Sequence, residues 1–366
     1  MILIAAAGTG GHIYPALAVA EALEARGVSS SEIVFVTSSR KVEDRIFSST
    51  NYRRIALPIG GLAGGLKGKA IGLVKIVMAA ITLRRRLANE ATSSPLVLIM
   101  FGGYISAVAR IGLLLRPKDV VVVETNSVMG RANRIFRLGA KATFAAFSDV
   151  SKGSGVPLRN SVLESLTSPV VNRQDVISTI ISSEEHFGRF IVAFGGSLGA
   201  RTINQSVLSL LEGGSLDGDI RTLIYLVVGE RDFAQFSTSR NFPLTIGDVT
   251  LAISEYDDEL IEKIKCCDCV ISRAGSNTVA ELAALSQAAV LIPLPTSPND
   301  HQKKNALWYR ESGRGVLIED DKVSNATLRG AIYEALNAPK VNLPELDELN
   351  VASKISSAVL SLLESL

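Results

Sequence analysis

A turn rich in small and polar residues in the C-terminal third of the sequence has the composition of an anion-binding site. Residues 272–281 (SRAGSNTVAE) follow the apolar residues 269–271 and lead into the helical pattern of residues 282–285. A glycine-containing turn that opens a helix directs free backbone N–H groups, and the positive end of the helix dipole, at whatever lies in front of it. Glu281 falls one turn further along, where a carboxylate can accept two hydrogen bonds from a vicinal diol such as a ribose. The segment therefore predicts a site for a nucleoside diphosphate.

Helix capping offers a second interpretation of the same residues. Thr278 and Glu281 stand three positions apart, as in a capping box, in which the Glu side chain bonds a backbone N–H group at the start of a helix. In that arrangement Glu281 is structural and contacts no ligand. The segment alone does not separate the two interpretations.

A histidine beside a second glycine turn is a candidate general base. The chain has three histidines, and His12 follows Gly8, Gly10 and Gly11 at the expected start of a helix. A helix N-terminus disfavours the imidazolium, so the ring stays neutral near neutral pH, as a base that deprotonates a hydroxyl requires. The structural alternative is a histidine whose ring bonds a carbonyl group of the turn.

Polar residues also follow two other apolar segments. Residues 300–305 (DHQKKN) come after the strand-like residues 290–292 and a proline-rich turn, where His301 and Gln302 can bond sugar hydroxyls. An N-capping aspartate with a solvated helix face is the structural alternative. In the first half of the chain, residues 124–126 (ETN) follow another apolar segment and can face a second substrate.

Two common nucleotide-binding motifs are incomplete in this sequence. The turn at residues 8–13 lacks the third glycine of the dinucleotide fingerprint, and no acidic residue closes the second expected strand, so a nicotinamide cofactor is disfavoured. Residues 63–70 have alanine where a P-loop needs its first glycine and where its Ser or Thr would hold magnesium. ATP chemistry is therefore not expected.

Length and composition set limits on the architecture and on the partners. With 366 residues, 47% of them apolar, the chain can bury two cores. The 38 basic and 36 acidic residues leave a net charge of +2, which provides no global field for nucleic acid. Cys266, Cys267 and Cys269 are crowded into one segment, which argues against a disulfide framework or a spaced zinc site and favours buried free thiols.

Apolar segments alternate with helical segments along the chain, which predicts parallel sheets covered by helices. The pattern restarts near residue 190, so we expect an α/β protein with two doubly wound, Rossmann-like domains, residues 1–167 and 168–349. A last helix, at about residues 350–366, can pack back onto the first domain. Ligands of such sheets bind at the carboxyl ends of the strands, so the site is expected in a cleft between the domains. The expected strands are residues 1–6, 33–37, 96–101, 120–123, 190–194, 222–228, 249–253, 269–271 and 289–292.

Residues 66–87 combine apolar residues with three lysines and three arginines at helical spacing. Such a helix can rest on an anionic membrane surface, where each cation contributes about 1 kcal/mol. The alternative is a helix whose apolar face belongs to the domain core and whose arginines are solvated.

The ordered set of motifs resembles the MurG family of peptidoglycan N-acetylglucosaminyltransferases, glycosyltransferase family 28. Residues 8–20 and 102–104 are similar to the two glycine loops of the family, and residues 195–201, 273–281 and 302–306 are similar to its donor-site motifs. The resemblance covers nearly the whole chain and implies the two-domain GT-B fold, with UDP-N-acetylglucosamine (UDP-GlcNAc) bound by the second domain and lipid I by the first. It implies an inverting transfer that gives lipid II, with no metal and no cofactor, at the cytoplasmic face of the cell membrane.

The resemblance also implies roles for individual residues. Donor contacts are expected from Thr9, Gly10, Gly11, Asn126, Ser197, Tyr256, Ser276, Asn277, Thr278, Glu281, His301 and Gln302, with the diphosphate at 276–278 and Ser197, the ribose at Glu281 and uracil at the backbone near Tyr256. His12 is expected as the base, with Glu124 and Asn126 as further catalytic residues. Tyr104 and Glu124 are expected to contact the acceptor.

Departures from the family pattern put the acceptor details in doubt. Val123 stands where the family has histidine, Leu198 where it has glutamine, and residues 168–173 only echo its interdomain motif. The donor motifs are largely intact, so the donor is better supported than the acceptor. The alternatives are another GT-B enzyme of UDP-sugars, such as a lipid glycosyltransferase or a UDP-GlcNAc 2-epimerase, and a non-catalytic UDP-sugar sensor.

Overall fold

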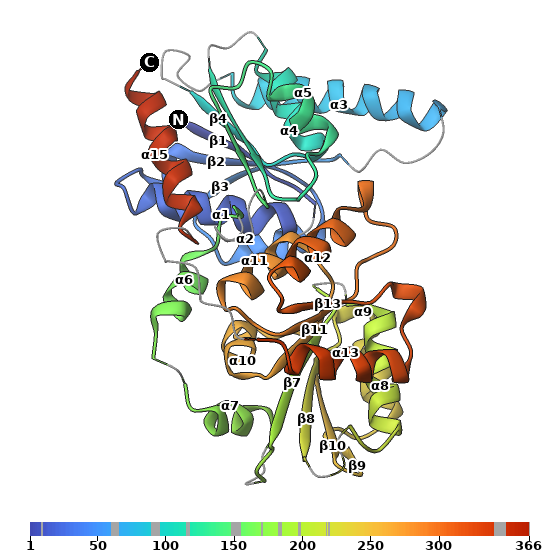
Figure 1. Ribbon diagram of the computed structural model, residues 1–366. Coiled ribbons are helices and arrows are strands. Elements are labelled where there is room, and N and C mark those ends of the chain that lie inside the picture. The colour runs from blue at the N-terminus through green and yellow to red at the C-terminus, as the bar shows by residue number, and fades with distance from the viewer. Residues whose placement is uncertain are drawn as a thin grey trace. The chain divides into compact units, whose positions relative to one another are not determined.

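The computed structural model divides the chain into two compact units (Figure 1). The first comprises Met1–Ser148, Gly155–Asn160 and Leu346–Leu366, and the second is built mainly of Ser161–Glu345. The units divide after Asn160, a few residues before the boundary that the sequence suggests. The structure describes all residues except 9, 60–65, 89–95, 115–117, 148–154, 170, 182–184, 197–198, 217, 219, 340–348 and 366.

The first unit contains a sheet of six parallel strands in the order β3-β2-β1-β4-β5-β6. These strands are β1 (Ile2–Ala5), β2 (Ile33–Ser38), β3 (Arg53–Leu57), β4 (Val97–Met100), β5 (Asp119–Glu124) and β6 (Ala142–Ala145). The central strands are continuous apolar runs because helices bury both faces of the sheet. The strand order reverses between β1 and β4, and the carboxyl ends at such a point are where these sheets bind ligands.

Two helical layers cover this sheet. One face carries α1 (Gly10–Glu24), α2 (Lys41–Ser48) and α15 (Val351–Glu364), and the other carries α3 (Leu66–Arg86) and α4 (Gly103–Gly112), with α5 (Arg131–Phe136) beside α4. Helix α15 comes from the far end of the sequence, yet it lies against α1 (Figure 1). Its Ile355 and Val359 are fully buried in the core of the first unit.

The second unit contains a seven-stranded sheet in the order β13-β12-β11-β7-β8-β10-β9. Its strands are β7 (Arg189–Phe194), β8 (Thr222–Val227), β9 (Leu244–Ile246), β10 (Val249–Ser254), β11 (Cys269–Ser272), β12 (Ala289–Leu291) and β13 (Gly315–Leu317). All pairs are parallel except β9 with β10. The strand order reverses where β7 meets β11, so the second unit has the same kind of ligand-binding edge as the first.

Helices of the second unit precede, connect and follow these strands along the chain. They are α6 (Asn160–Thr167), α7 (Arg173–Ile180), α8 (Arg201–Glu212), α9 (Glu230–Ser239), α10 (Leu260–Cys266), α11 (Ser276–Ala284), α12 (His301–Glu311) and α13 (Asn325–Leu336). Two doubly wound α/β units are therefore confirmed, and each of the nine expected strands is present. The three cysteines are free thiols, and burial raises the pKa of Cys267 and Cys269. Among the described residues, no helix has both the length and the apolar character needed to cross a membrane.

Candidate active site

The predicted anion-binding turn lies at the reversal point of the second sheet. Strand β11 ends at Ser272, and α11 begins at Ser276 with Gly275 as its N-cap. The N-cap is a glycine, which has no side chain to bond the N–H groups of the first helical turn. Ser276 is buried, and Asn277 and Thr278 are half-buried. The geometry is that of a helix N-terminus prepared for an anion.

Glu281 lies inside α11, and the capping-box interpretation of this residue is wrong. A capping box needs Ser or Thr at the N-cap and Glu at the third helical residue. Here the N-cap is Gly275, so Thr278 is itself the third helical residue and Glu281 lies further along the helix. The Glu281 carboxylate is half-buried and has no hydrogen bond or ion pair with any residue that the structure describes. Burial raises the pKa of Glu281 to about 7. A carboxylate in this state is available to a ligand that can donate hydrogen bonds to it.

Two residues that sequence reasoning left without a role hold the turn in place. Arg273 donates from Nη1 to the carbonyls of Ile292 (3.0 Å) and Pro293 (3.3 Å), and the same atom contacts Asp320. Asn305 is buried and donates from Nδ2 to the Ala274 carbonyl, at 3.1 Å. Arg273 therefore ties the end of β11 to the end of β12 and is already engaged by protein acceptors.

His301 and Gln302 lie at the start of α12, after β12, and so near the same edge of the sheet as α11. Gln302 Oε1 accepts from the Leu294 N–H at 2.9 Å, and His301 Nδ1 lies 2.8 Å from the Pro298 carbonyl oxygen. Both side chains hold the turn before α12. Asp300 is the N-cap, but its side chain makes no capping hydrogen bond, so that structural alternative is not realised.

Tyr256 is exposed in the loop after β10, at the carboxyl edge of the second sheet. Its carbonyl accepts from Ser254 Oγ at 2.8 Å. The adjacent Asp257 accepts from Tyr225 Oη at 2.8 Å and pairs with the buried Lys263 at 3.2 Å. These contacts fix the backbone on which the predicted uracil contact depends.

His12 lies in the first turn of α1, just after the glycine turn of the first unit. Its Nδ1 is 3.3 Å from the Ala7 carbonyl oxygen. A carbonyl oxygen can only accept, so the proton of a neutral ring sits on Nδ1 and Nε2 is the acceptor nitrogen. The structural alternative for His12 is thus realised, and it leaves the ring in the tautomer that a base requires. Gly10 and Gly11 open the same helix, whereas Thr9 and Ser197 lie outside the described residues.

Glu124, at the end of β5, is surrounded by protein hydrogen-bond donors. Its side chain is 3% exposed, and its Oε1 accepts from the backbone N–H (3.0 Å) and Nδ2 (3.3 Å) of Asn126. Its Oε2 accepts from the Gly130 N–H (2.8 Å) and from Asn133 Nδ2 (3.0 Å). A carboxylate offers about four acceptor positions, and protein donors fill them here. Glu124 therefore positions the Asn126–Gly130 loop, and the substrate contact expected of it stays a prediction.

Tyr104 lies half-buried in the first turn of α4, after β4. Its hydroxyl donates to the Ile59 carbonyl at 3.4 Å. Ser106 Oγ bonds both the N–H and the carbonyl of Gly102, at 3.0 and 2.9 Å, and so fixes the second glycine turn. The expected acceptor contact of Tyr104 stays a prediction.

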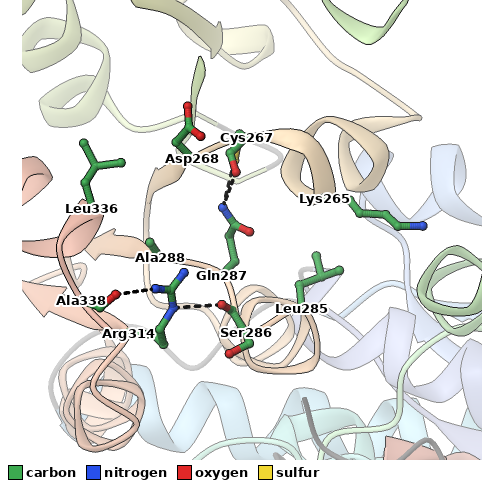
Figure 2. A pocket seen from close by; sticks show the side chains of 10 residues that line it. All are labelled: Lys265, Cys267, Asp268, Leu285, Ser286, Gln287, Ala288, Arg314, Leu336 and Ala338. Carbon is green, nitrogen blue, oxygen red and sulfur yellow. Dashed lines mark hydrogen bonds between the residues drawn. The ribbon is translucent and has the colours of Figure 1, made fainter. Parts of the chain in front are cut away.

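A pocket of about 450 Å³ lies at the opposite edge of the second sheet (Figure 2). Asp268, Ala288 and Arg314, which line it, immediately precede β11, β12 and β13. Arg314 donates to the carbonyls of Ser286 and Ala338, each at 3.0 Å, and Gln287 reaches the Cys267 carbonyl. None of the predicted site residues lines this pocket. In the described part of the chain, no three His, Cys, Asp or Glu side chains are grouped as a metal site.

The two doubly wound units and their glycine turns define the GT-B class of glycosyltransferases. Solved structures agree: the crystal structure of Acinetobacter baumannii MurG matches with a TM-score of 0.68 at 21% identity, covering 100% of this chain and 99% of that one. The calicheamicin glycosyltransferase CalG4 matches with a TM-score of 0.64 at 12% identity, covering 99% and 98%.

The chain belongs to glycosyltransferase family 28. The N-terminal domain model of this family matches residues 2–145, and its C-terminal domain model matches residues 190–359. A relative from Verminephrobacter eiseniae is 32% identical over 88% of this chain and 86% of its own length. One from Desulforudis audaxviator is 29% identical over 93% and 90%. Both carry the name UDP-N-acetylglucosamine–N-acetylmuramyl-(pentapeptide) pyrophosphoryl-undecaprenol N-acetylglucosamine transferase.

Proposed function

We propose that this protein is an inverting glycosyltransferase of peptidoglycan synthesis. It transfers N-acetylglucosamine from UDP-GlcNAc to the 4-hydroxyl of the muramyl sugar of undecaprenyl-pyrophosphoryl-MurNAc-pentapeptide, lipid I, and the product is lipid II. The names of relatives that match most of the chain support both substrates. The structural observation that carries the proposal is Glu281, a carboxylate without a described partner, set behind a helix N-terminus whose N-cap is glycine.

The donor half of the site follows from this geometry. The N–H groups of Ser276, Asn277 and Thr278 would bind the diphosphate, and Glu281 would accept hydrogen bonds from the two ribose hydroxyls. His301 and Gln302 would meet the sugar once they leave their present backbone partners.

The reaction is a single in-line displacement. The acceptor 4-hydroxyl attacks the anomeric carbon, a new C–O bond forms, and the bond between that carbon and the phosphate oxygen breaks with its electron pair leaving on UDP. Nε2 of His12 takes the hydroxyl proton, and the anomeric configuration inverts. The amides that open α11 stabilise the charge growing on the diphosphate, an effect of roughly 10²-fold or more per donor.

The face of α3 that points away from the core is the proposed membrane contact. The apolar residues of α3 divide into two sets, because Ile76, Ala80 and Leu83 are buried in the core whereas others are 41 to 62% exposed. The exposed set is Ile71, Leu73, Val74, Val77, Met78 and Ile81. A core-helix interpretation accounts only for the first set. Lys75 and the three arginines at residues 84–86 are exposed beside the second set.

Helix α5 adds to this surface. It lies beside α4, which in turn packs on α3 (Figure 1). Ile135 and Leu138 are exposed at its end, next to the exposed Arg134 and Arg137. An anionic leaflet suits this combination of apolar and cationic groups, so we place the enzyme at the cytoplasmic face of the bacterial cell membrane, bound peripherally.

The experiment that tests the function uses labelled UDP-GlcNAc and a short-chain lipid I analogue. We expect the labelled disaccharide product with release of UDP. Bound UDP-GlcNAc without any disaccharide would contradict the transferase and favour a UDP-sugar sensor. Conversion of UDP-GlcNAc to its 2-epimer without an acceptor would favour an epimerase.

The assignment of the base has its own variant. His12→Ala should lower kcat by about 10²- to 10⁴-fold and leave UDP affinity unchanged, because the ring acts on the acceptor proton. His186, which is exposed, supplies the matched control His186→Ala. Near-normal turnover of His12→Ala would exclude this residue as the base.

A further inference from the structure

We propose that Glu43 is a positioning residue that acts on His12 through the peptide group between Ala7 and Gly8. The inference rests on the proposed function, in which His12 is the base. Glu43 lies in the first turn of α2, far from His12 in the sequence, and no motif of the sequence points to it.

The connection consists of two hydrogen bonds to one peptide group. The N–H of Gly8 donates to Glu43 Oε1 at 2.8 Å. The carbonyl of Ala7, which belongs to the same planar group, lies 3.3 Å from His12 Nδ1. The orientation of this plane therefore sets both contacts together. If the plane turns, the carbonyl that faces the imidazole turns with it.

The burial of Glu43 shows how firmly the fold holds this carboxylate. Glu43 is 0% exposed, and a buried charge is costly unless it is paired and hydrogen-bonded. Ser38 Oγ donates to the same oxygen as Gly8, and Arg54 Nη2 lies 3.5 Å from Oε2. The first turn of α2 adds the positive end of a helix dipole.

Arg54 is itself fixed by the strand beneath it. Its Nε donates to Thr37 Oγ1 at 2.7 Å, and its Nη2 donates to the Ser38 carbonyl at 2.8 Å. Its Nη1 reaches the exposed Asp44 at 2.6 Å. The end of β2 thus holds Arg54 in place beside the Glu43 carboxylate. That carboxylate in turn fixes the peptide group at the end of β1.

The chemical consequence concerns the tautomer of His12. A peptide whose N–H is bonded to a carboxylate has a more strongly polarised carbonyl, which is a better acceptor for the Nδ1 proton. The hydrogen bond at one imidazole nitrogen decides which nitrogen holds the proton. Glu43 therefore favours the Nδ1–H form, and Nε2 stays free of a proton to receive the one from the acceptor hydroxyl.

The first test reads the tautomer directly. The chain has three histidines, so the imidazole ¹⁵N signals of His12 can be assigned by comparison with His12→Ala. At pH 8 we expect the Nδ1–H form in the parent protein and a clear population of the Nε2–H form in Glu43→Gln. An unchanged tautomer in a folded Glu43→Gln variant would overturn the proposal, whatever the role of His12 in catalysis.

The second test is a double-mutant cycle on kcat. Glu43→Gln should lower kcat by about 10-fold, as loss of a carboxylate behind a functional histidine does, without changing UDP affinity. In the His12→Ala background the same substitution should have no further effect. Equal losses in both backgrounds would show that Glu43 does not act through His12. Full activity of His12→Ala would instead refute the base assignment, and the tautomer measurement would still decide the role of Glu43.

Two further variants serve as a control and as a substitute for Glu43→Gln. Asp44→Asn is the matched control, because Asp44 contacts Arg54 at the outer end of the network and neither Gly8 nor Ser38. It should leave the tautomer and kcat as in the parent. If Glu43→Gln does not fold, Ser38→Ala removes a donor from the same carboxylate oxygen, and it should shift the tautomer in the same direction by a smaller amount.

Discussion

At the scale of single residues, Glu281 shows how a fold can keep a charge available for a ligand. Its neighbours bury it enough to raise its pKa to about 7, and none of the described residues pairs with it. A structural carboxylate in this protein looks different, since Glu124 has four protein donors around it. The absence of a described partner is what makes Glu281 the better candidate for ligand recognition.

Donor binding should depend on the protonation of Glu281. Only the ionised carboxylate accepts hydrogen bonds from both ribose hydroxyls, and with a pKa of about 7 it is largely protonated at pH 6. UDP affinity should therefore rise between pH 6 and pH 8, with release of a proton on binding. Titration calorimetry in buffers of different ionisation enthalpy measures both. Glu281→Gln should bind UDP about 10- to 100-fold more weakly and lose the pH dependence, unlike Glu334→Gln on the exposed face of α13.

The same pKa has a consequence for stability. Its ordinary value is 4.5, so the folded protein holds this proton more tightly than the unfolded chain does. That stabilisation is complete below about pH 4.5 and is lost as the pH rises through 7. Glu281→Gln should accordingly be more stable than the parent at pH 8, by about 1–2 kcal/mol because the side chain is partly exposed, and equally stable near pH 4.5. A difference independent of pH, in urea denaturation, would contradict this.

At the scale of elements, the loop that starts at Asn126 depends on one side chain. Glu124→Gln replaces an acceptor oxygen by an NH₂ group, which then faces the donors of Gly130 and Asn133 or of Asn126. We expect about 1–3 kcal/mol of destabilisation and a raised KM for the acceptor. UDP affinity should stay unchanged. A variant with normal acceptor KM would show that this loop does not shape the acceptor site.

The turn between β7 and α8 depends on glycine. Gly199 has φ +74°, and a Cβ there would lie 2.2 Å from the Val228 carbonyl oxygen. Gly199→Ala should cost more than about 2 kcal/mol. The single tryptophan, Trp308, is buried in the second unit, so its fluorescence during urea denaturation reports this unit. Gly330→Ala, in open space on α13, is the control and should be neutral or stabilising by up to about 1 kcal/mol.

The strands that could be predicted from the sequence are those in the middle of the sheets. The four that were missed are β3, β6, β9 and β13, and these are the four edge strands. A central parallel strand is buried on both sides and so must be a continuous apolar run. An edge strand is partly solvated, and β3 begins with two arginines while β6 alternates between partly and fully exposed positions. An edge strand is defined by the strand that it pairs with, and this partner cannot be read from the local sequence.

Prediction of the site had a similar limit. The glycine turns, the start of α11 and Glu281 could be found because each is a local pattern in the sequence. Arg273, Asn305 and Glu43 could not, because their roles are contacts with backbone groups 19 to 35 positions away. The capping-box alternative for Glu281 could be excluded only when the first residue of α11 was known.

At the scale of the whole molecule, we predict that the protein binds anionic membranes through α3. Changing Arg84, Arg85 and Arg86 to Glu should lower the binding constant for anionic vesicles, measured by sedimentation, by more than about 100-fold. The reason is that each cation contributes about 1 kcal/mol to binding. Lys354→Glu is the matched control, because Lys354 is exposed on α15, which covers the opposite face of the same sheet. Unchanged sedimentation of the triple variant would mean that these arginines are only solvated.

The position of α15 in the first unit determines the order in which the two units can fold during translation. Residues 351–364 emerge after all of the second unit has been translated, yet Ile355 and Val359 fill the core beneath α1. The N-terminal unit is synthesised first, but the part of its core that α15 covers stays exposed until α15 has been translated. The second unit, continuous from Ser161, can complete its sheet earlier, so the unit proposed to bind the nucleotide should fold before the unit that carries His12.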